Sequence, residues 1–187
     1  MCTMSIGFVF GFAFLAAIAT AVPLERRPEL GQFQDESKCF PYEKPWFAML
    51  RNFENDPYVG GTAKCIRVTQ TAPLQGHVSE NVVEFGHTHR ARNRLTLTNT
   101  EGYQHKNALN VTFLEGPGKG STIQLFNAYS DCDKCKIYRN PYAGENACTL
   151  FVPESQKNQI DPSCLFIFNL LCGGDKHYLL LDDSCTF

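Results

Sequence analysis

Three short stretches of the chain combine residue types that could carry chemistry. His87 and His89 have the spacing of two metal ligands on one strand face, but no third ligand is identifiable, so we predict no metal site. Cys132 and Cys135 form a Cys-x-x-Cys pair, which in an exported chain indicates two structural half-cystines. Residues 116–121 are rich in glycine, but their spacing does not match a phosphate-binding loop and favours a hairpin turn.

The remaining sequence contains no recognisable catalytic motif. No stretch matches the nucleophile elbow of a hydrolase, and we therefore predict a binding protein that is not an enzyme and uses no cofactor. The formal net charge of -2 at pH 7 argues against a nucleic-acid partner. Beyond residue 21 no stretch is long and apolar enough to span a bilayer, so no membrane partner is expected.

The first 21 residues indicate export. Residues 6–18 form an uncharged apolar run that is too short to span a membrane, and a small-x-small cleavage site follows at 19–21. We predict a signal peptide over 1–21 and a secreted, extracellular domain over 22–187. Cleavage would remove Cys2 from the nine cysteines and leave eight, an even number that suits disulfide bonding. Asn110 heads the single N-glycosylation sequon, which fits an exported surface.

The mature chain divides into a leader and a series of short strand-like runs. The leader, about 22–38, is polar and punctuated by proline, and we expect it to be loosely ordered. Turn residues separate eight runs with no helical pattern between them, which predicts an antiparallel meander closed as a barrel or sandwich. The predicted strands are 46–53, 63–71, 80–89, 93–99, 107–115, 121–129, 134–139 and 147–153.

Side-chain alternation orients two of these strands. If Asn110 is glycosylated it must face outward, and its strand neighbours then face inward by the two-residue period of a strand. Alternate residues of the next strand share one face in the same way. The two sets are Leu109, Val111 and Phe113, and then Ile123, Leu125, Asn127 and Tyr129.

One helix is predicted near the C-terminus. Asp161 can cap it, Pro162 suits its first turn, and Gly173 ends it. An apolar strand over 178–181 follows. Eight strands, one helix and a returning strand make a lipocalin-like architecture, and an eight-stranded barrel is wide enough to hold one small ligand.

From about Trp46 to its end, the chain resembles the tick salivary lipocalins of the histamine-binding family. The segments that carry the resemblance are NDPYVGGTAKC (55–65), AYSDCDKCKIY (128–138), ACTLFV (147–152), IDPSC (160–164) and the terminal Cys185. The resemblance implies an all-β barrel with one helix that sequesters a host mediator such as histamine, serotonin or an eicosanoid. Some members of the family instead bind a host protein such as complement.

The resemblance also implies two of the four disulfides. By it, Cys65 pairs with Cys185, and Cys135 pairs with Cys164. For the remaining cysteines we expect a Cys132–Cys148 bridge across one hairpin and a Cys39–Cys172 bridge that fastens the leader to the helix.

The ligand-binding pattern of the family is only partly retained. Where amine-binding members carry a Cys-Asp-aliphatic motif, this chain has Lys136 in place of the acid, and Leu125 aligns with a further inner-wall aspartate. Thr149 and Phe151 stand where amine binders have a glutamate and a tryptophan. Phe53 and Asp56 match an aromatic residue and an aspartate near the pocket mouth.

Three ligand classes therefore remain open. An amine would use the acidic and aromatic candidates, because a buried ammonium needs carboxylates and ring faces. An anionic lipid such as a leukotriene would place its carboxylate against His87 and His89 if both face inward; the alternative is that these histidines lie at the barrel rim. A host protein would bind to the loops instead. The candidate ligand-binding residues are Phe53, Asp56, Tyr58, Glu84, His87, His89, Tyr129, Thr149 and Phe151.

Overall fold

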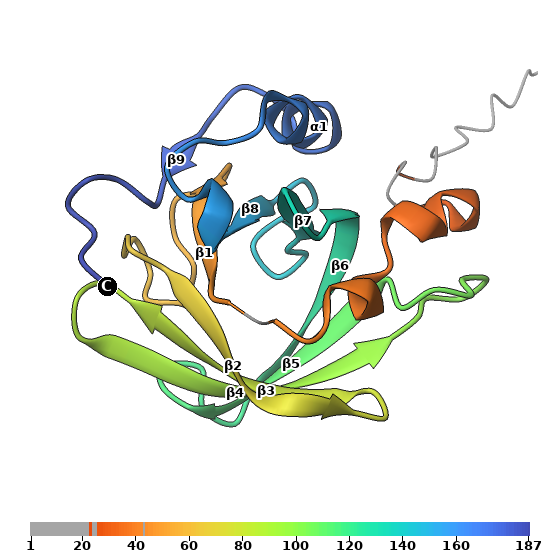
Figure 1. Cartoon of the computed structure of the whole chain (residues 1–187), viewed down its shortest axis with the longest axis horizontal. Helices are drawn as coiled ribbons and strands as arrows, with labels where there is room; N and C mark the ends of the chain where they lie inside the picture. The colour runs from red at the N-terminus through yellow and green to blue at the C-terminus, as the bar shows by residue number, and fades with distance from the viewer. Residues whose placement is uncertain (1–22, 24–25, 43) are drawn as a thin grey trace, which may run out of the picture.

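The computed structural model describes residue 23, residues 26–42 and residues 44–187 (Figure 1). The predicted signal peptide, residues 1–21, lies outside the described residues. In the part that is described, no helix is long and apolar enough to cross a membrane. The main strands are β1 (Trp46–Arg51), β2 (Arg67–Gln75), β3 (Val78–Phe85), β4 (His89–Thr98), β5 (Ala108–Glu115), β6 (Thr122–Asp131), β7 (Cys135–Arg139) and β8 (Cys148–Pro153).

These eight strands form a closed antiparallel barrel, which confirms the predicted fold class. Strands β2 to β8 pair in chain order, and β8 then pairs with β1. Trp46 of β1 pairs with Val68 of β2, and this contact closes the barrel. A short strand β9 (Tyr178–Leu179) pairs with the other end of β1, where Leu50 lies opposite Leu179.

Strand β3 ends earlier than the sequence predicts. The predicted run continued to His89, but β3 stops at Phe85 and Gly86 turns the chain at a φ of 59°. Glycine adopts this left-handed backbone conformation without strain. As a result His87 lies in the turn and His89 begins β4.

The alternation predicted for β5 is confirmed, whereas that for β6 is broken. Leu109, Val111 and Phe113 are buried in the barrel core, and Asn110 faces the outer surface, where its Oδ1 accepts a hydrogen bond of 3.0 Å from Gln124. In β6 the pairing with β7 shifts register between Asn127 and Tyr129. The shift is a bulge, and a bulge changes the face to which the following residue points.

The helix α1 (Pro162–Cys172) has the boundaries that the sequence predicts. Asp161 accepts a hydrogen bond of 2.8 Å from the backbone of Ser163, and the helix ends at Gly173, which has a φ of 81°. Its buried face lies against the outside of β7 and β8, above the barrel in Figure 1. There it joins a second apolar core that includes Phe47, Ile137 and Phe168.

Four disulfides close the structure. The pairs Cys65–Cys185 and Cys135–Cys164 are those that the family resemblance implies. The expected Cys132–Cys148 and Cys39–Cys172 bridges are wrong, because the structure pairs Cys39 with Cys132 and Cys148 with Cys172. The strand register explains the correction: Cys148 lies opposite Arg139, at the end of β7 that is remote from the 132–135 turn.

The leader is more ordered than its composition predicts. Residues Pro28–Phe33 and Glu36–Cys39 form two 3-10 helices, η2 and η3, which lie beside β6. Asp35 caps η3 by accepting a hydrogen bond from the backbone of Ser37, and Glu36 is completely buried. The order comes from tertiary contacts, since Cys39 is tied to Cys132 and Glu36 to β7.

The Cys65–Cys185 bridge should govern stability rather than ligand choice. It joins residues 120 positions apart, and its removal by Cys65→Ser with Cys185→Ser should lower the free energy of unfolding by about 2–4 kcal/mol. Urea denaturation followed by circular dichroism measures the loss. Neither cysteine lines the barrel cavity, so ligand preference should be unchanged. Altered preference with unaltered stability would contradict this assignment.

Candidate functional site

A cavity of about 110 Å³ lies inside the barrel. This volume is below the roughly 300–1,000 Å³ of pockets that hold drug-sized ligands, so the cavity suits a small molecule. Most of its wall is apolar and comes from inward-facing strand residues. Among these are Val83, Leu95, Val111, Phe113, Ile123 and Leu125.

Arg51 and Asp56 lie at one end of this cavity. Arg51 is 1 % exposed, and its Nη2 donates hydrogen bonds of 2.6 and 2.7 Å to the carbonyl oxygens of Glu54 and Gly61. Its Nη1 is 3.9 Å from Oδ2 of Asp56. Burial lowers the pKa of Arg51, and the negative charge of Asp56 opposes that shift. The guanidinium is therefore a fixed cation that is largely satisfied by the surrounding loop.

Asp56 is the one carboxylate among the described residues that line the cavity. Its Oδ1 accepts hydrogen bonds of 3.0 and 3.1 Å from the backbone N–H groups of Tyr58 and Val59. Its Oδ2 accepts a hydrogen bond of 2.9 Å from the hydroxyl of Tyr142. Burial first, and then the charge of Asp56, raise the pKa of Tyr142 well above its ordinary value of 10.0.

A pair of asparagines provides polar groups in the apolar wall. Asn93 of β4 donates a hydrogen bond of 3.1 Å to Oδ1 of Asn81, the residue that lies opposite it in β3. Within the described residues Oδ1 of Asn93 has no hydrogen-bond partner, although it is buried. Sequence reasoning missed this pair. The available signal was parity, because Asn81 shares the inward face of Val83.

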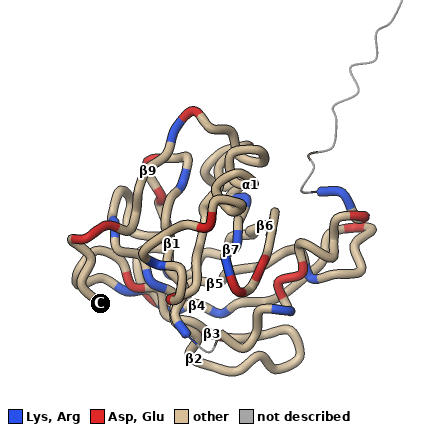
Figure 2. Tube along the Cα trace, turned by 45° about the horizontal axis from the view of Figure 1, so that its top comes forward, with Lys and Arg blue, Asp and Glu red and all other residues tan. Residues whose placement is uncertain are grey.

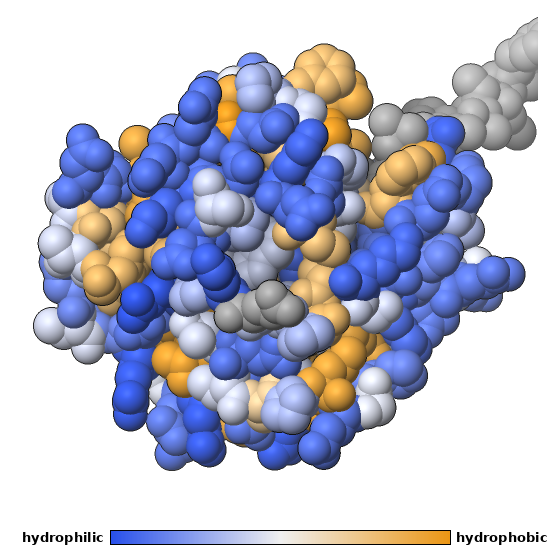
Figure 3. Space-filling model, in the orientation of Figure 1, coloured by the Kyte–Doolittle hydropathy of each residue, from blue (hydrophilic) through white to orange (hydrophobic). Residues whose placement is uncertain are grey.

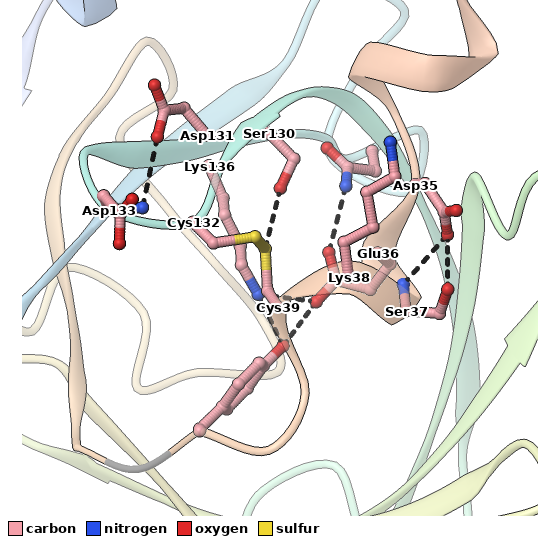
Figure 4. Close-up of a disulfide and its surroundings, with 12 residues drawn as sticks. Asp35, Glu36, Ser37, Lys38, Cys39, Ser130, Asp131, Cys132, Asp133 and Lys136 are labelled. Carbon is pink, nitrogen blue, oxygen red and sulfur yellow. Dashed lines mark hydrogen bonds and ion pairs between the residues drawn. A yellow bond between two sulfur atoms is a disulfide. The ribbon is translucent and has the colours of Figure 1, made fainter.

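Lys136 occupies the other end of the cavity, beside Tyr42 and Trp46. Its Nζ donates hydrogen bonds of 2.8 Å to Oε1 of Glu36 and 2.8 Å to the hydroxyl oxygen of Tyr42. Figure 4 shows the Lys136 side chain reaching from β7 toward Glu36, next to the Cys39–Cys132 disulfide. Asn127 donates a further hydrogen bond of 3.0 Å to Oε2 of Glu36.

The two polar ends are well separated. Trp46 begins β1 and lies near Lys136, while Arg51 ends the same strand. The two polar groups are therefore placed toward opposite ends of β1. Sequence reasoning did not assign Glu36 or Tyr42 to the site, because Glu36 belongs to the predicted loose leader and Tyr42 lies between that leader and the first predicted strand.

The structure brings three of the nine predicted ligand residues to the cavity wall. They are Asp56, Thr149 and Phe151. Thr149 accepts a hydrogen bond of 2.7 Å from Asn140. Two more candidates support the wall from behind: Tyr58 stacks on Phe113 with ring centroids 5.3 Å apart, and Phe53 packs against the guanidinium of Arg51.

The other four candidates, Glu84, His87, His89 and Tyr129, lie outside the cavity lining. Glu84 has the opposite parity to Val83 and forms an ion pair of 2.7 Å with Arg67. The turn at Gly86 leaves His87 and His89 exposed at the barrel rim. The β6 bulge turns Tyr129 toward the outer core beneath α1.

An eight-stranded closed barrel around a small apolar cavity, with one helix packed on its outer face, defines a lipocalin-like ligand-binding protein. The family model described as "Tick histamine binding protein" matches residues 24–187, and the chain belongs to this family. The match confirms the resemblance found in the sequence. It also places the chain among binding proteins rather than enzymes.

Solved structures share the fold at low sequence identity. The AM182 serotonin complex is 17% identical, with a TM-score of 0.58 over 83% of this chain and 95% of that one. Japanin from Rhipicephalus appendiculatus, bound to cholesterol, is 12% identical, with a TM-score of 0.53 over 76% of this chain and 95% of that one. Apocrustacyanin C1 is 15% identical, with a TM-score of 0.52 over 86% and 89%. No curated protein sequence matches the chain.

Three tyrosines around the cavity should ionise late. Burial first, and then the charge of Glu36, raise the pKa of Tyr42 and Tyr138 well above 10.0, as burial and Asp56 do for Tyr142. In an alkaline titration followed at 295 nm, at least three of the seven tyrosines should stay protonated after the exposed ones have ionised, until the protein unfolds.

The raised pKa values of these three tyrosines also determine how the stability of the protein depends on pH. Below pH 10 the three tyrosines are protonated in both states and do not affect the free energy of unfolding. Above pH 10 the unfolded chain loses these protons first, so stability should fall as the pH rises. Tyr142→Phe should reduce the number of late tyrosines by one. A single midpoint near 10 for all seven in the folded protein would contradict the site geometry.

Proposed function

We propose that this protein is a secreted scavenger that sequesters one small host mediator, a biogenic amine such as histamine or serotonin, and thereby suppresses host defence. The observation that carries the proposal is the arrangement of the cavity: a buried carboxylate at one end, an apolar chamber, and an unsatisfied amide oxygen in the wall. A biogenic amine has the matching parts, namely an ammonium group, an aromatic ring and a polar N–H or O–H on that ring.

Asp56 is the group that would hold the ammonium. Moving an ammonium out of water is costly unless a carboxylate compensates its charge. The 3.9 Å separation from Arg51 leaves Asp56 without a close ion-pair partner, so the hydroxyl of Tyr142 is the contact that a ligand cation can share or replace. The ring of Tyr142 adds an aromatic face for a cation–π contact.

Asn93 would orient the rest of the ligand. Its free Oδ1 can accept a hydrogen bond from an imidazole N–H or an indole hydroxyl, and burial makes such a bond worth more than in water. The apolar side chains around it would pack on the ring. The family match supports this ligand class, and the serotonin bound to the AM182 structure fits it.

A scavenger needs affinity and rigidity but no turnover. A barrel held by four disulfides is ordered before the ligand arrives, so binding costs little further entropy. The disulfides and the predicted signal peptide support secretion. The outward position of Asn110 supports glycosylation at that residue.

An anionic lipid mediator is the second candidate, and one observation favours it. Nε of Arg51 is buried, belongs to a cavity-lining residue, and has no hydrogen-bond partner among the described residues. A ligand carboxylate could accept that bond. The candidate ranks second because the cavity of about 110 Å³ has little room for a long acyl chain.

A host protein partner is less well supported. The face in Figure 3 is mainly hydrophilic, with apolar side chains in separate small groups. Figure 2 shows acidic and basic residues interspersed along the trace, without a block of one sign. A binding surface for a protein partner would be marked by a larger apolar patch.

The proposal is tested by calorimetric titration of the refolded mature protein with histamine, serotonin and leukotriene B4 in parallel. We expect an amine to bind at one site. Asp56→Asn keeps the Oδ1 contacts to the backbone but removes the charge, and it should weaken amine binding by about tenfold to a hundredfold. The matched control Asp175→Asn changes an exposed acid and should have no effect.

The other outcomes redirect the assignment. Binding of leukotriene without any amine would replace the amine proposal with the anionic one, and Arg51→Met should then abolish that binding. Amine binding that Asp56→Asn leaves intact would remove Asp56 from the site. No heat with any of the three ligands would overturn small-mediator sequestration in favour of a protein partner.

A further inference from the structure

We propose that Lys136 is a tethered occupant of an ammonium-binding cage, so that the chain itself fills one polar end of its barrel and leaves the Asp56 end for an external ligand. Binding of an external ligand at Asp56 rests on the proposed function. The cage itself rests on the surroundings of one nitrogen atom, Nζ of Lys136.

The cage has the composition of a site that recognises alkylammonium ions. Nζ of Lys136 is 2.8 Å from Oε1 of Glu36 and 2.8 Å from the hydroxyl oxygen of Tyr42. It also lies 4.0 Å from the ring centroid of Tyr42, 4.4 Å from that of Trp46 and 5.8 Å from that of Phe40. A carboxylate together with several aromatic faces is the combination that holds a desolvated ammonium.

The parts of the cage come from separate segments that are each anchored independently of the lysine. Glu36 belongs to η3, which the Asp35 cap and the Cys39–Cys132 bridge hold in place. Asn127 of β6 donates to the second carboxylate oxygen of Glu36. Trp46 is set by the β1–β2 closure of the barrel. Removal of the lysine amine should therefore leave a preformed cage rather than a collapsed one.

Electrostatics would make the vacated cage attract a cation. Glu36 is 0 % exposed and Lys136 is 1 % exposed, so each depends on the other for compensation of its charge. A buried carboxylate that has lost its partner is strongly unfavourable. Lys136→Ala keeps Cβ and removes the three outer methylenes and the ammonium, and n-propylammonium has the shape and charge to replace them.

The tethered ammonium also sets the direction of an external amine. Lys136, Tyr42 and Trp46 line the same cavity as Asp56, but at the opposite end. The lysine competes at the high effective concentration of a covalently attached group, and it repels a second cation. The cage is thereby closed to a ligand ammonium, and the barrel should take up one amine rather than two.

The test is rescue of Lys136→Ala by n-propylammonium chloride. The variant should have a lower melting temperature than the unmodified chain. Millimolar n-propylammonium should raise the melting temperature of the variant and bind with a stoichiometry of one by calorimetry, while the unmodified chain shows neither response. Lys119→Ala, which removes an exposed lysine, should behave like the unmodified chain. Lys136→Ala with Glu36→Gln should lose the rescue.

Three results would overturn the cage. The first is a folded Lys136→Ala that responds to n-propylammonium no more than the unmodified chain does. The second is an equal response to n-propanol, which would show filling of space without recognition of charge. The third uses the native protein, so it applies even if the variant does not fold. Acetylation by acetic anhydride, mapped by mass spectrometry, should leave Lys136 unmodified while Lys119 reacts. Comparable acetylation rates at the two lysines would refute a caged ammonium.

These outcomes are separable from those of the proposed function. The rescue uses no natural mediator, so silence toward histamine and serotonin would overturn the amine proposal without affecting the cage. Conversely, a failed rescue alongside intact amine binding at Asp56 would overturn the cage alone.

Discussion

The buried ion pair between Glu36 and Lys136 is the central interaction at the Lys136 end of the barrel cavity. Both groups are removed from water, and each loses its hydration in exchange for the other's charge and for contacts with Tyr42 and Asn127. Loss of one partner of such a pair typically costs about 3–5 kcal/mol, because it leaves a buried charge uncompensated. The pair therefore helps to hold η3 against β7, beside the Cys39–Cys132 bridge. A segment of polar composition becomes part of the barrel wall through these two connections.

The same constraint shapes the ligand site at the other end. Both cations that line the cavity face a carboxylate, but at different distances: Lys136 is 2.8 Å from Glu36, whereas Arg51 is 3.9 Å from Asp56. The close pair is electrostatically satisfied, and the loose pair retains the capacity to engage a charged ligand. Between them the Asn81–Asn93 pair offers an oxygen without a partner. Polarity inside the barrel is thus graded from a satisfied end to an unsatisfied one.

A second source of stability lies outside the cavity. Helix α1 packs on the outer face of β7 and β8 in a core separate from the inner wall. Two of the disulfides, Cys135–Cys164 and Cys148–Cys172, join that helix to β7 and β8. The residues of this outer core do not line the ligand cavity, so residues of the inner wall can change without disturbing it.

Local sequence determined the elements, and tertiary structure decided which of them meet. Two-residue alternation and turn residues were enough to predict the eight strands and the inward face of β5, because both depend on neighbours in the chain. Asp161, Pro162 and Gly173 similarly set the helix boundaries. Strand register, in contrast, cannot be read from local pattern. The register places Cys148 opposite Arg139, away from Cys132, and two of the expected disulfides are wrong for that reason. The bulge in β6 likewise turns Tyr129 toward the outer face. The burial of Glu36 depended on a partner 100 residues away, since the free energy that orders the leader comes from contacts that no segment makes by itself.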